Sequence, residues 1–176
     1  MKTQRAKKKE NKLKKLIGKL HLWFGLLIGS IVLFISLTGA LYVFKDEIEG
    51  LERNKYLYHN EPNIENKEKL KLKVLEKLVN EQVKEEYPIH WVNIPIDRAM
   101  TYQFYWYEHD PKGWNYFKEY PVYKSAYVNP YNGKVLKVYD EKNAFFNIVK
   151  SLHWGFLLNS EWGKWLTGIP VTIFVF

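Results

Sequence analysis

The chain has 176 residues, no cysteine and a formal net charge of +8 at pH 7. The absence of cysteine excludes disulfides, thiolate zinc sites, iron–sulfur clusters and covalent CxxCH attachment of haem within the chain. The positive charge does not indicate a nucleic-acid partner, because nine basic residues lie together in residues 1–19, ahead of a long apolar run. They are Lys2, Arg5, Lys7, Lys8, Lys9, Lys12, Lys14, Lys15 and Lys19.

Residues 20–44 are predicted to form a transmembrane helix. From Leu22 onward the run has no charge for about 23 residues, which at ~1.5 Å per residue spans a hydrocarbon core of ~30 Å. The basic residues 1–19 predict a cytoplasmic tail, so the segment after the helix is expected outside. A signal peptide cleaved after Ala40 is the alternative, but the apolar run exceeds the usual ~7 to 15 residues and favours a retained anchor.

One side of this helix combines a histidine with small residues. Within a sector of ~80° lie His21, Gly25, Gly29, Val32, Ser36 and Gly39. An imidazole beside such a flat groove suits a porphyrin, whereas the spacing of Gly25 and Gly29 equally suits close packing of two helices. A third interpretation of His21 is an interfacial side chain that reaches the headgroups.

Residues 45–140 are predicted to form an extracytoplasmic α+β domain, with one helix on a small antiparallel sheet. A polar connector over residues 47–62 leads to an amphipathic helix at 67–86. Strand-like runs follow at residues 89–94, 101–108, 121–128 and 134–139, with a turn at 129–133 before the last.

The domain contains three histidines and many aromatic residues. His59, His90 and His109 have no ligand-like spacing, so we expect ordinary surface or strand residues. The aromatic residues favour core and interface packing, and a platform for a flat ligand is the alternative. They are Tyr102, Phe104, Tyr105, Trp106, Tyr107, Trp114, Tyr116 and Phe117.

The C-terminal part returns to an apolar pattern. Residues 141–164 are predicted to form an interfacial helix that contains His153, broken by a polar turn at 159–164. Residues 165–176 begin a second span, and about 12 residues are too few to cross a bilayer, so the chain is expected to stop inside that span. An aromatic belt of Trp154, Trp162 and Trp165 predicts that His153 lies near the outer surface.

The chain resembles the PepSY-associated transmembrane (PepSY_TM) family, from Lys19 over nearly its whole length. The motifs that carry the resemblance are Leu20-His21-x-Trp23-x-Gly25, Leu37-Thr38-Gly39, Ala126-Tyr127-Val128-Asn129-Pro130-x-x-Gly133-Lys134-Val135-Leu136, and Leu152-His153-x-Gly155 followed by Gly163. The resemblance implies a bacterial inner-membrane protein with a PepSY domain outside, and further spans beyond those seen here. Characterised relatives include ferric-siderophore reductases whose membrane histidines ligate b-type haem.

Carried over residue by residue, the resemblance implies that His21 and His153 are axial ligands of haem iron. It also implies that Gly25 and Gly29 leave room for the porphyrin ring. About 23 helical residues would separate the two imidazoles by ~30 Å, so they cannot share one iron. Each haem then needs a second ligand from the missing C-terminal spans or from a partner subunit.

Two functions follow as hypotheses. The first is part of a haem-dependent reductase that passes electrons outward to an extracytoplasmic ferric siderophore. The second is a non-enzymatic membrane-anchored PepSY module that binds or regulates a partner such as a peptidase. The sequence has no HExxH, GxSxG, phosphate-binding GxxxxGK[ST] or dinucleotide-binding GxGxxG motif, so electrons would have to come from a separate donor.

Overall fold

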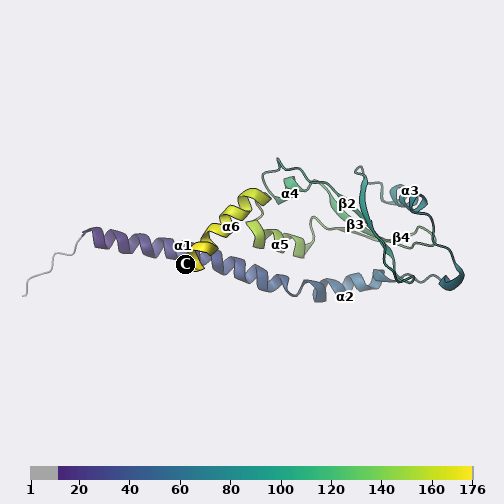
Figure 1. The fold of residues 1–176 in the computed structure, drawn as a ribbon, viewed down its shortest axis with the longest axis horizontal. Coiled ribbons are helices and arrows are strands. Elements are labelled where there is room, and N and C mark those ends of the chain that lie inside the picture. Colours follow the sequence, from purple (N-terminus) through teal and green to yellow (C-terminus); the bar gives the residue numbers. More distant parts are fainter. Residues whose placement is uncertain (1–11, 176) are drawn as a thin grey trace, which may run out of the picture.

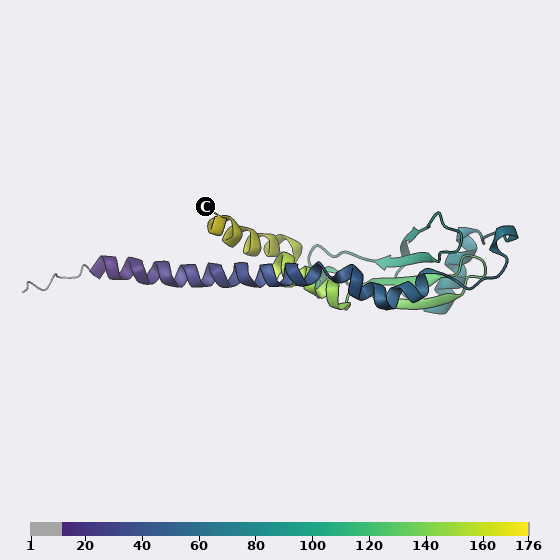
Figure 2. The ribbon, with the colours of Figure 1, turned by 90° about the horizontal axis from the view of Figure 1, so that it is seen from below.

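The computed structural model describes residues 12–175, so most of the predicted cytoplasmic tail (1–11) and Phe176 lie outside the described residues. The molecule consists of a long helical stalk, Lys12–Leu57, with a sheet domain at one end (Figures 1 and 2). Two further helices return from the sheet domain and pack against the stalk. The arrangement fits a transmembrane helix with an attached α+β domain.

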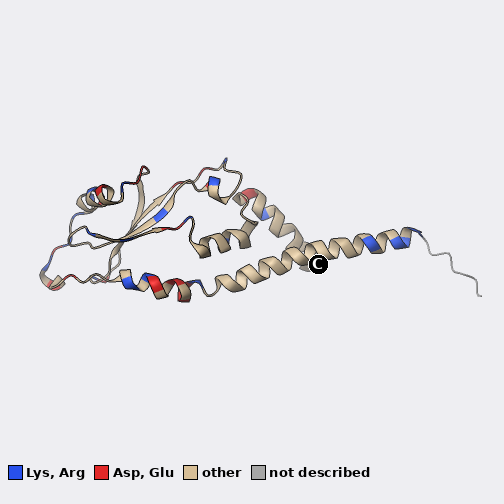
Figure 3. Ribbon diagram, turned by 180° about the vertical axis from the view of Figure 1, so that it is seen from behind, with Lys and Arg blue, Asp and Glu red and all other residues tan. Residues whose placement is uncertain are grey.

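Helix α1 (Lys12–Tyr42) begins before residue 20, because the lysines and leucines of its first turns are good helix formers. The helical stretch Lys12–Leu57 is long and apolar enough to cross a membrane. Figure 3 shows this uncharged stretch between lysines at one end and mixed charges at the other.

The predicted polar connector at 47–62 is wrong, because most of it is helical. After a short turn at Val43 and Phe44 the chain enters α2 (Lys45–Leu57). Side chains one turn apart stabilise this helix: Glu49 pairs with Lys45 at 3.4 Å and with Arg53 at 3.1 Å. A single-turn 3₁₀ helix (Ile64–Asn66) follows.

The amphipathic helix predicted at 67–86 is confirmed as the shorter α3 (Leu72–Val83). It ends where Lys84 adopts the left-handed conformation, with φ of 53°. Its fully buried Leu75 and Val79 pack on one face of the sheet.

All four predicted strands are confirmed in one antiparallel sheet of order β1-β2-β3-β4. They are β1 (Ile89–Asn93), β2 (Tyr102–Tyr107), β3 (Tyr123–Val128) and β4 (Val135–Asp140). Gly133, with φ of +72°, provides the left-handed residue of the turn between β3 and β4. Side chains alternate along β2, so Phe104 and Trp106 enter the core under α3 while Tyr105 and Tyr107 face the other side.

The C-terminal helices differ from the predicted boundaries. Between β2 and β3 lies a short helix that was not predicted, α4 (Tyr116–Glu119). A helix is present in the predicted region as α5 (Phe145–Gly155), but α6 (Ser160–Val175) includes residues expected to form a turn. Asn159 explains this start, because its side chain accepts the backbone N–H of Trp162 at 3.0 Å and caps the first turn.

Candidate functional site

His153 lies at the end of α5 and is held against α1. Its Nδ1 is 2.9 Å from the backbone oxygen of Ile35 and 3.4 Å from Oγ1 of Thr38. A carbonyl oxygen only accepts, so Nδ1 must carry the hydrogen and donate it. The lone pair of the neutral ring is then on Nε2, which makes no hydrogen bond within residues 12–175. A backbone carbonyl that orients an imidazole in this way is typical of metal-ligating histidines.

Gly39 allows this approach. A Cβ at position 39 would lie 2.8 Å from Cε1 of His153, closer than real Cβ contacts. The structure therefore brings together two sequence motifs that lie far apart in the chain, Thr38-Gly39 and Leu152-His153.

His21 is separate from this contact. It is exposed on α1, and a Cβ at Gly25 or Gly29 would meet nothing within 4 Å in the described part of the chain. The rise of a helix places His21 ~21–27 Å along α1 from residues 35–39, which His153 contacts. His21 and Gly39 are 18 residues apart, close to five whole turns, so both face the side on which α5 and α6 pack.

A cavity of about 520 Å³ lies between the sheet and the pair α5 and α6, and His153 is part of its wall. Its volume is in the range of small-molecule and cofactor sites. Aromatic side chains form much of the lining: Trp91, Tyr107, Tyr116, Tyr120, Tyr123 and Trp154. The aromatic residues of the domain therefore divide between a packed core and a cavity wall, and only the first role was the favoured prediction.

The aromatic wall is closely packed. The rings of Tyr107 and Tyr120 lie 5.6 Å apart, and those of Tyr116 and Tyr120 lie 5.4 Å apart. Burial raises the pKa of Tyr116 and Tyr120 above the usual range of a phenol. Both hydroxyls thus stay protonated at neutral pH and present a neutral surface to the cavity.

Glu119 is a buried carboxylate at the same cavity. It accepts hydrogen bonds from the backbone N–H of Ser160 at 3.0 Å, from Oγ of Ser160 at 2.6 Å and from Nε2 of His109 at 3.1 Å. These contacts join α4 to the first turn of α6. The carboxylate is therefore already satisfied.

Two lysines complete the charge of the cavity. Lys150 of α5 and Lys164 of α6 line it, and neither forms a salt bridge with any of residues 12–175. Lys150 is half-buried and its Nζ lies 5.4 Å from the centroid of the Trp154 ring. Burial, followed by the nearby positive charge of Lys45, lowers the pKa of Lys150.

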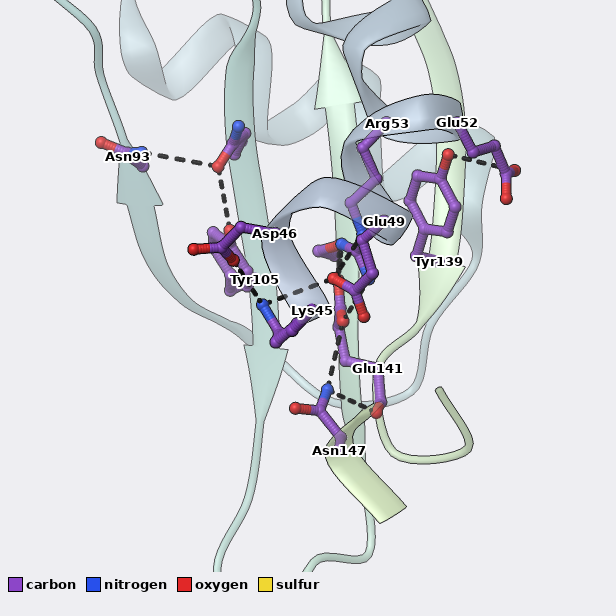
Figure 4. A network of polar contacts seen from close by, with 12 residues as sticks. Lys45, Asp46, Glu49, Glu52, Arg53, Asn93, Tyr105, Tyr139, Glu141 and Asn147 are labelled. Carbon is purple, nitrogen blue, oxygen red and sulfur yellow. Dashed lines mark hydrogen bonds and ion pairs between the residues drawn. The ribbon is translucent and has the colours of Figure 1, made fainter. Parts of the chain in front are cut away.

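A second polar centre, which the sequence did not predict, joins the stalk to the sheet domain (Figure 4). Buried Glu141 accepts two hydrogen bonds from the guanidinium of Arg53, at 2.6 and 2.9 Å, and one from Ser125 at 2.6 Å. The side chain of Asn147 donates to the backbone oxygen of Glu141 at 2.8 Å. Glu141 therefore links α2, β3 and α5.

The three histidines of the domain have different surroundings. His90 and His109 are exposed, as expected. The expectation is wrong for His59, which is buried between the backbone oxygen of Arg98, 3.0 Å from Nε2, and the backbone N–H of Glu61, 3.2 Å from Nδ1. Both ring nitrogens are used within the fold, so His59 has a structural role. Within residues 12–175 no three His, Asp or Glu side chains form a metal-binding group.

The family described as the PepSY-associated TM region matches residues 19–176. The chain belongs to the PepSY-associated TM region family. No curated protein matches the chain.

Family membership makes this a membrane PepSY-associated protein. The matched region contains both histidine motifs, the sheet domain and all of α6. In this PepSY-associated TM protein the second histidine motif thus contacts α1 near its C-terminal end. The first motif lies on the same side of α1, nearer its N-terminus.

Proposed function

We propose that this PepSY-associated TM protein is part of a b-type haem reductase of the bacterial inner membrane. It passes electrons outward to an extracytoplasmic ferric chelate, such as an iron siderophore. The observation that carries the proposal is the orientation of His153, whose Nδ1 is engaged by the Ile35 carbonyl so that Nε2 remains available to iron.

The residues present fit a haem in part. At the outer end, His153 offers one imidazole beside a cavity large enough for a cofactor. At the inner end, His21 offers another beside the open surface at Gly25 and Gly29. Each of the two imidazoles would hold one haem iron. Bound haem supplies one-electron transfer.

The chain's own residues orient these ligands. Ile35 and Thr38 set the tautomer and direction of His153, and Gly39 leaves room for its ring. The sheet domain lies at the end of the stalk that we propose to be outside the membrane (Figure 1). The aromatic cavity next to His153 is therefore at the side on which the ferric chelate would arrive.

One observation favours a second candidate, a module that binds a partner. The outer edge of β1 is unpaired in the described sheet, and the chain after it carries Ile94 and Ile96, which are 50% and 102% exposed. An open strand edge beside exposed apolar residues suits an added strand from another protein. This candidate needs no imidazole in the membrane.

Haem spectroscopy of the full-length protein tests the proposal. His21→Ala and His153→Ala are each expected to remove about one haem and leave the other, because sites ~21 Å or more apart share no ligands. Reduced-minus-oxidised absorbance spectra and haem-to-protein ratios measure this. His90→Ala, at an exposed histidine of the sheet domain, is the matched control and should retain both haems.

Gly39→Ala provides a variant that keeps both histidines. The new methyl group displaces His153, so haem at that position should fall as in His153→Ala, while Gly18→Ala, where nothing lies within 4 Å, should have no effect. Wild-type protein without haem absorbance, purified after haem was supplied during expression, would overturn the proposal in favour of the partner-binding module.

A further inference from the structure

The cavity beside His153 contains more positive charge than the fold itself neutralises. Lys150 and Lys164 both line it, and neither forms a salt bridge within residues 12–175. The attraction that Glu141 exerts on Lys150 is weaker than the repulsion from Lys45. The acidic side chain that lines the cavity, Glu119, already accepts three hydrogen bonds, from Ser160 and His109, so the wall holds two ammonium groups and one carboxylate. Holding a half-buried ammonium group without a counter-ion is costly, so the site suits an anionic ligand.

The rest of the wall specifies the shape of that ligand. Six aromatic side chains line the cavity, and aromatic faces favour a flat, apolar body. Ile35 of α1 and Val171 of α6 line the cavity too and add apolar surface. A planar ring system with two carboxylates matches an aromatic wall with two ammonium groups.

We propose that Lys150 and Lys164 bind the two propionate groups of the haem whose iron is ligated by His153. The inference rests on the proposed function, because it assumes that haem is present at His153. It assigns the cavity to the haem and gives the two lysines a role in holding it. Charge-assisted contacts of this kind are roughly twice as strong as neutral hydrogen bonds.

The two lysines should contribute unequally. Lys150 is half-buried, whereas Lys164 is exposed and more strongly screened by solvent. Lys150→Gln should therefore weaken haem retention more than Lys164→Gln. A bound propionate would also restore the charged state of Lys150 that burial disfavours.

The test compares haem with its dimethyl ester, in which both propionates are neutral. Full-length protein is loaded with one or the other, and transfer to an excess of apomyoglobin measures the dissociation rate. The lysine variants are made in protein that also carries His21→Ala, so that only the site at His153 is measured. Protein with both histidines is followed in parallel, and its haem dissociation is fitted as two kinetic phases, one for each site. In protein with both lysines, haem should dissociate at least about tenfold more slowly than the ester, which is equivalent to ~1.4 kcal/mol.

The double variant Lys150→Gln with Lys164→Gln should lose this preference while His153 still binds both compounds. Lys118→Gln, on α4 next to Glu119 but outside the cavity lining, is the matched loss of charge and should keep the preference. An unchanged preference in the double variant would overturn the inference and leave the proposed function standing. Equal loss of haem and ester would also overturn it, because the lysines would then support the fold. Failure of the wild type to bind haem at all would overturn both proposals.

Discussion

At the scale of single residues, the contact between Arg53 and Glu141 shows how charge holds the stalk to the sheet domain. The carboxylate of Glu141 is buried and accepts a two-pronged contact from the guanidinium, which also lies 4.6 Å from the centre of the Tyr139 ring. The hydrogen bonds to Glu141 raise the pKa of Arg53 still further, so Arg53 stays charged at any physiological pH. Removing one partner leaves a buried charge without compensation.

Arg53→Met should therefore destabilise the protein by about 3 kcal/mol, the lower end for a buried pair because Arg53 is partly exposed. In a chain of this size that lowers the melting temperature by roughly 6–12 °C. Thermal unfolding of the detergent-purified protein measures it. Lys45→Met, which removes a more exposed partner of Glu49, is the control and should cost less than about 1 kcal/mol. Equal effects of the two substitutions would contradict a special role for Glu141.

Tyr105 predicts how the sheet domain responds to alkaline pH. Burial raises the pKa of Tyr105 to about 12 from 10.0. Between these values the folded chain keeps a proton that the unfolded chain has lost, so stability present below pH 10 declines as pH rises towards 12. Tyr105→Phe removes this titrating group, so the free energy of unfolding should fall less steeply with pH. The difference in protons bound by the folded and unfolded chains should be smaller by up to one. Melting temperatures from pH 8 to pH 12 measure it, with Tyr58→Phe at an exposed tyrosine as the comparison. Parallel curves for wild type and Tyr105→Phe would contradict the assignment.

At the scale of elements, α5 and α6 form a tight helix pair that connects the cavity to the stalk. A Cβ at Gly155 would lie 2.6 Å from Cα of Gly163, and a Cβ at Gly163 would lie 2.7 Å from Cα of Gly155. The obstacle in each case is backbone, which cannot rotate away. Small residues at this crossing therefore determine how closely the two helices approach, and with it the width of the cavity.

Gly163→Ala should separate α5 from α6 and cost about 1–3 kcal/mol, as overpacking usually does. Because alanine also improves helix propensity by up to ~1 kcal/mol, Gly168→Ala on the same helix gives the baseline. Nothing lies within 4 Å of that position, so Gly168→Ala should be neutral or stabilising. Melting temperatures of both variants decide the point, and a Gly163→Ala protein as stable as the control would show that the helices are not in close contact.

At the scale of the whole molecule, the charge distribution predicts its orientation in the bilayer. The lysines at the start of α1 contrast with the mixed charges of α2 at its other end (Figure 3). The positive-inside rule then predicts a cytoplasmic N-terminus, with the sheet domain on the opposite side. This orientation also places His153 and its cavity at the outer end of the stalk.

A reporter that is active only in the cytoplasm, fused after Tyr139 in β4, should give no signal in cells. The same reporter fused to the N-terminus of this protein should be fully active and serves as the positive control. Strong activity after Tyr139 would reverse the orientation and, with it, the direction of electron transfer in the proposed function.

The sequence by itself was enough to predict features that depend on neighbouring residues. The uncharged run from Leu22 predicts α1, strand-like runs predict all four strands, and Asn132-Gly133 predicts the turn before β4. The histidine motifs and the intervening hairpin were enough to indicate the family that the comparison shows.

How these elements meet depends on contacts between residues that are far apart in the sequence. The docking of α2 on the sheet domain was not predicted, because Arg53 and Glu141 are 88 residues apart in the sequence. The contact of His153 with Ile35 spans 118 residues, and the cavity forms from side chains of the sheet, α5 and α6 together. Local periodicity contains no information about such distant partners, because they become neighbours only when the chain packs.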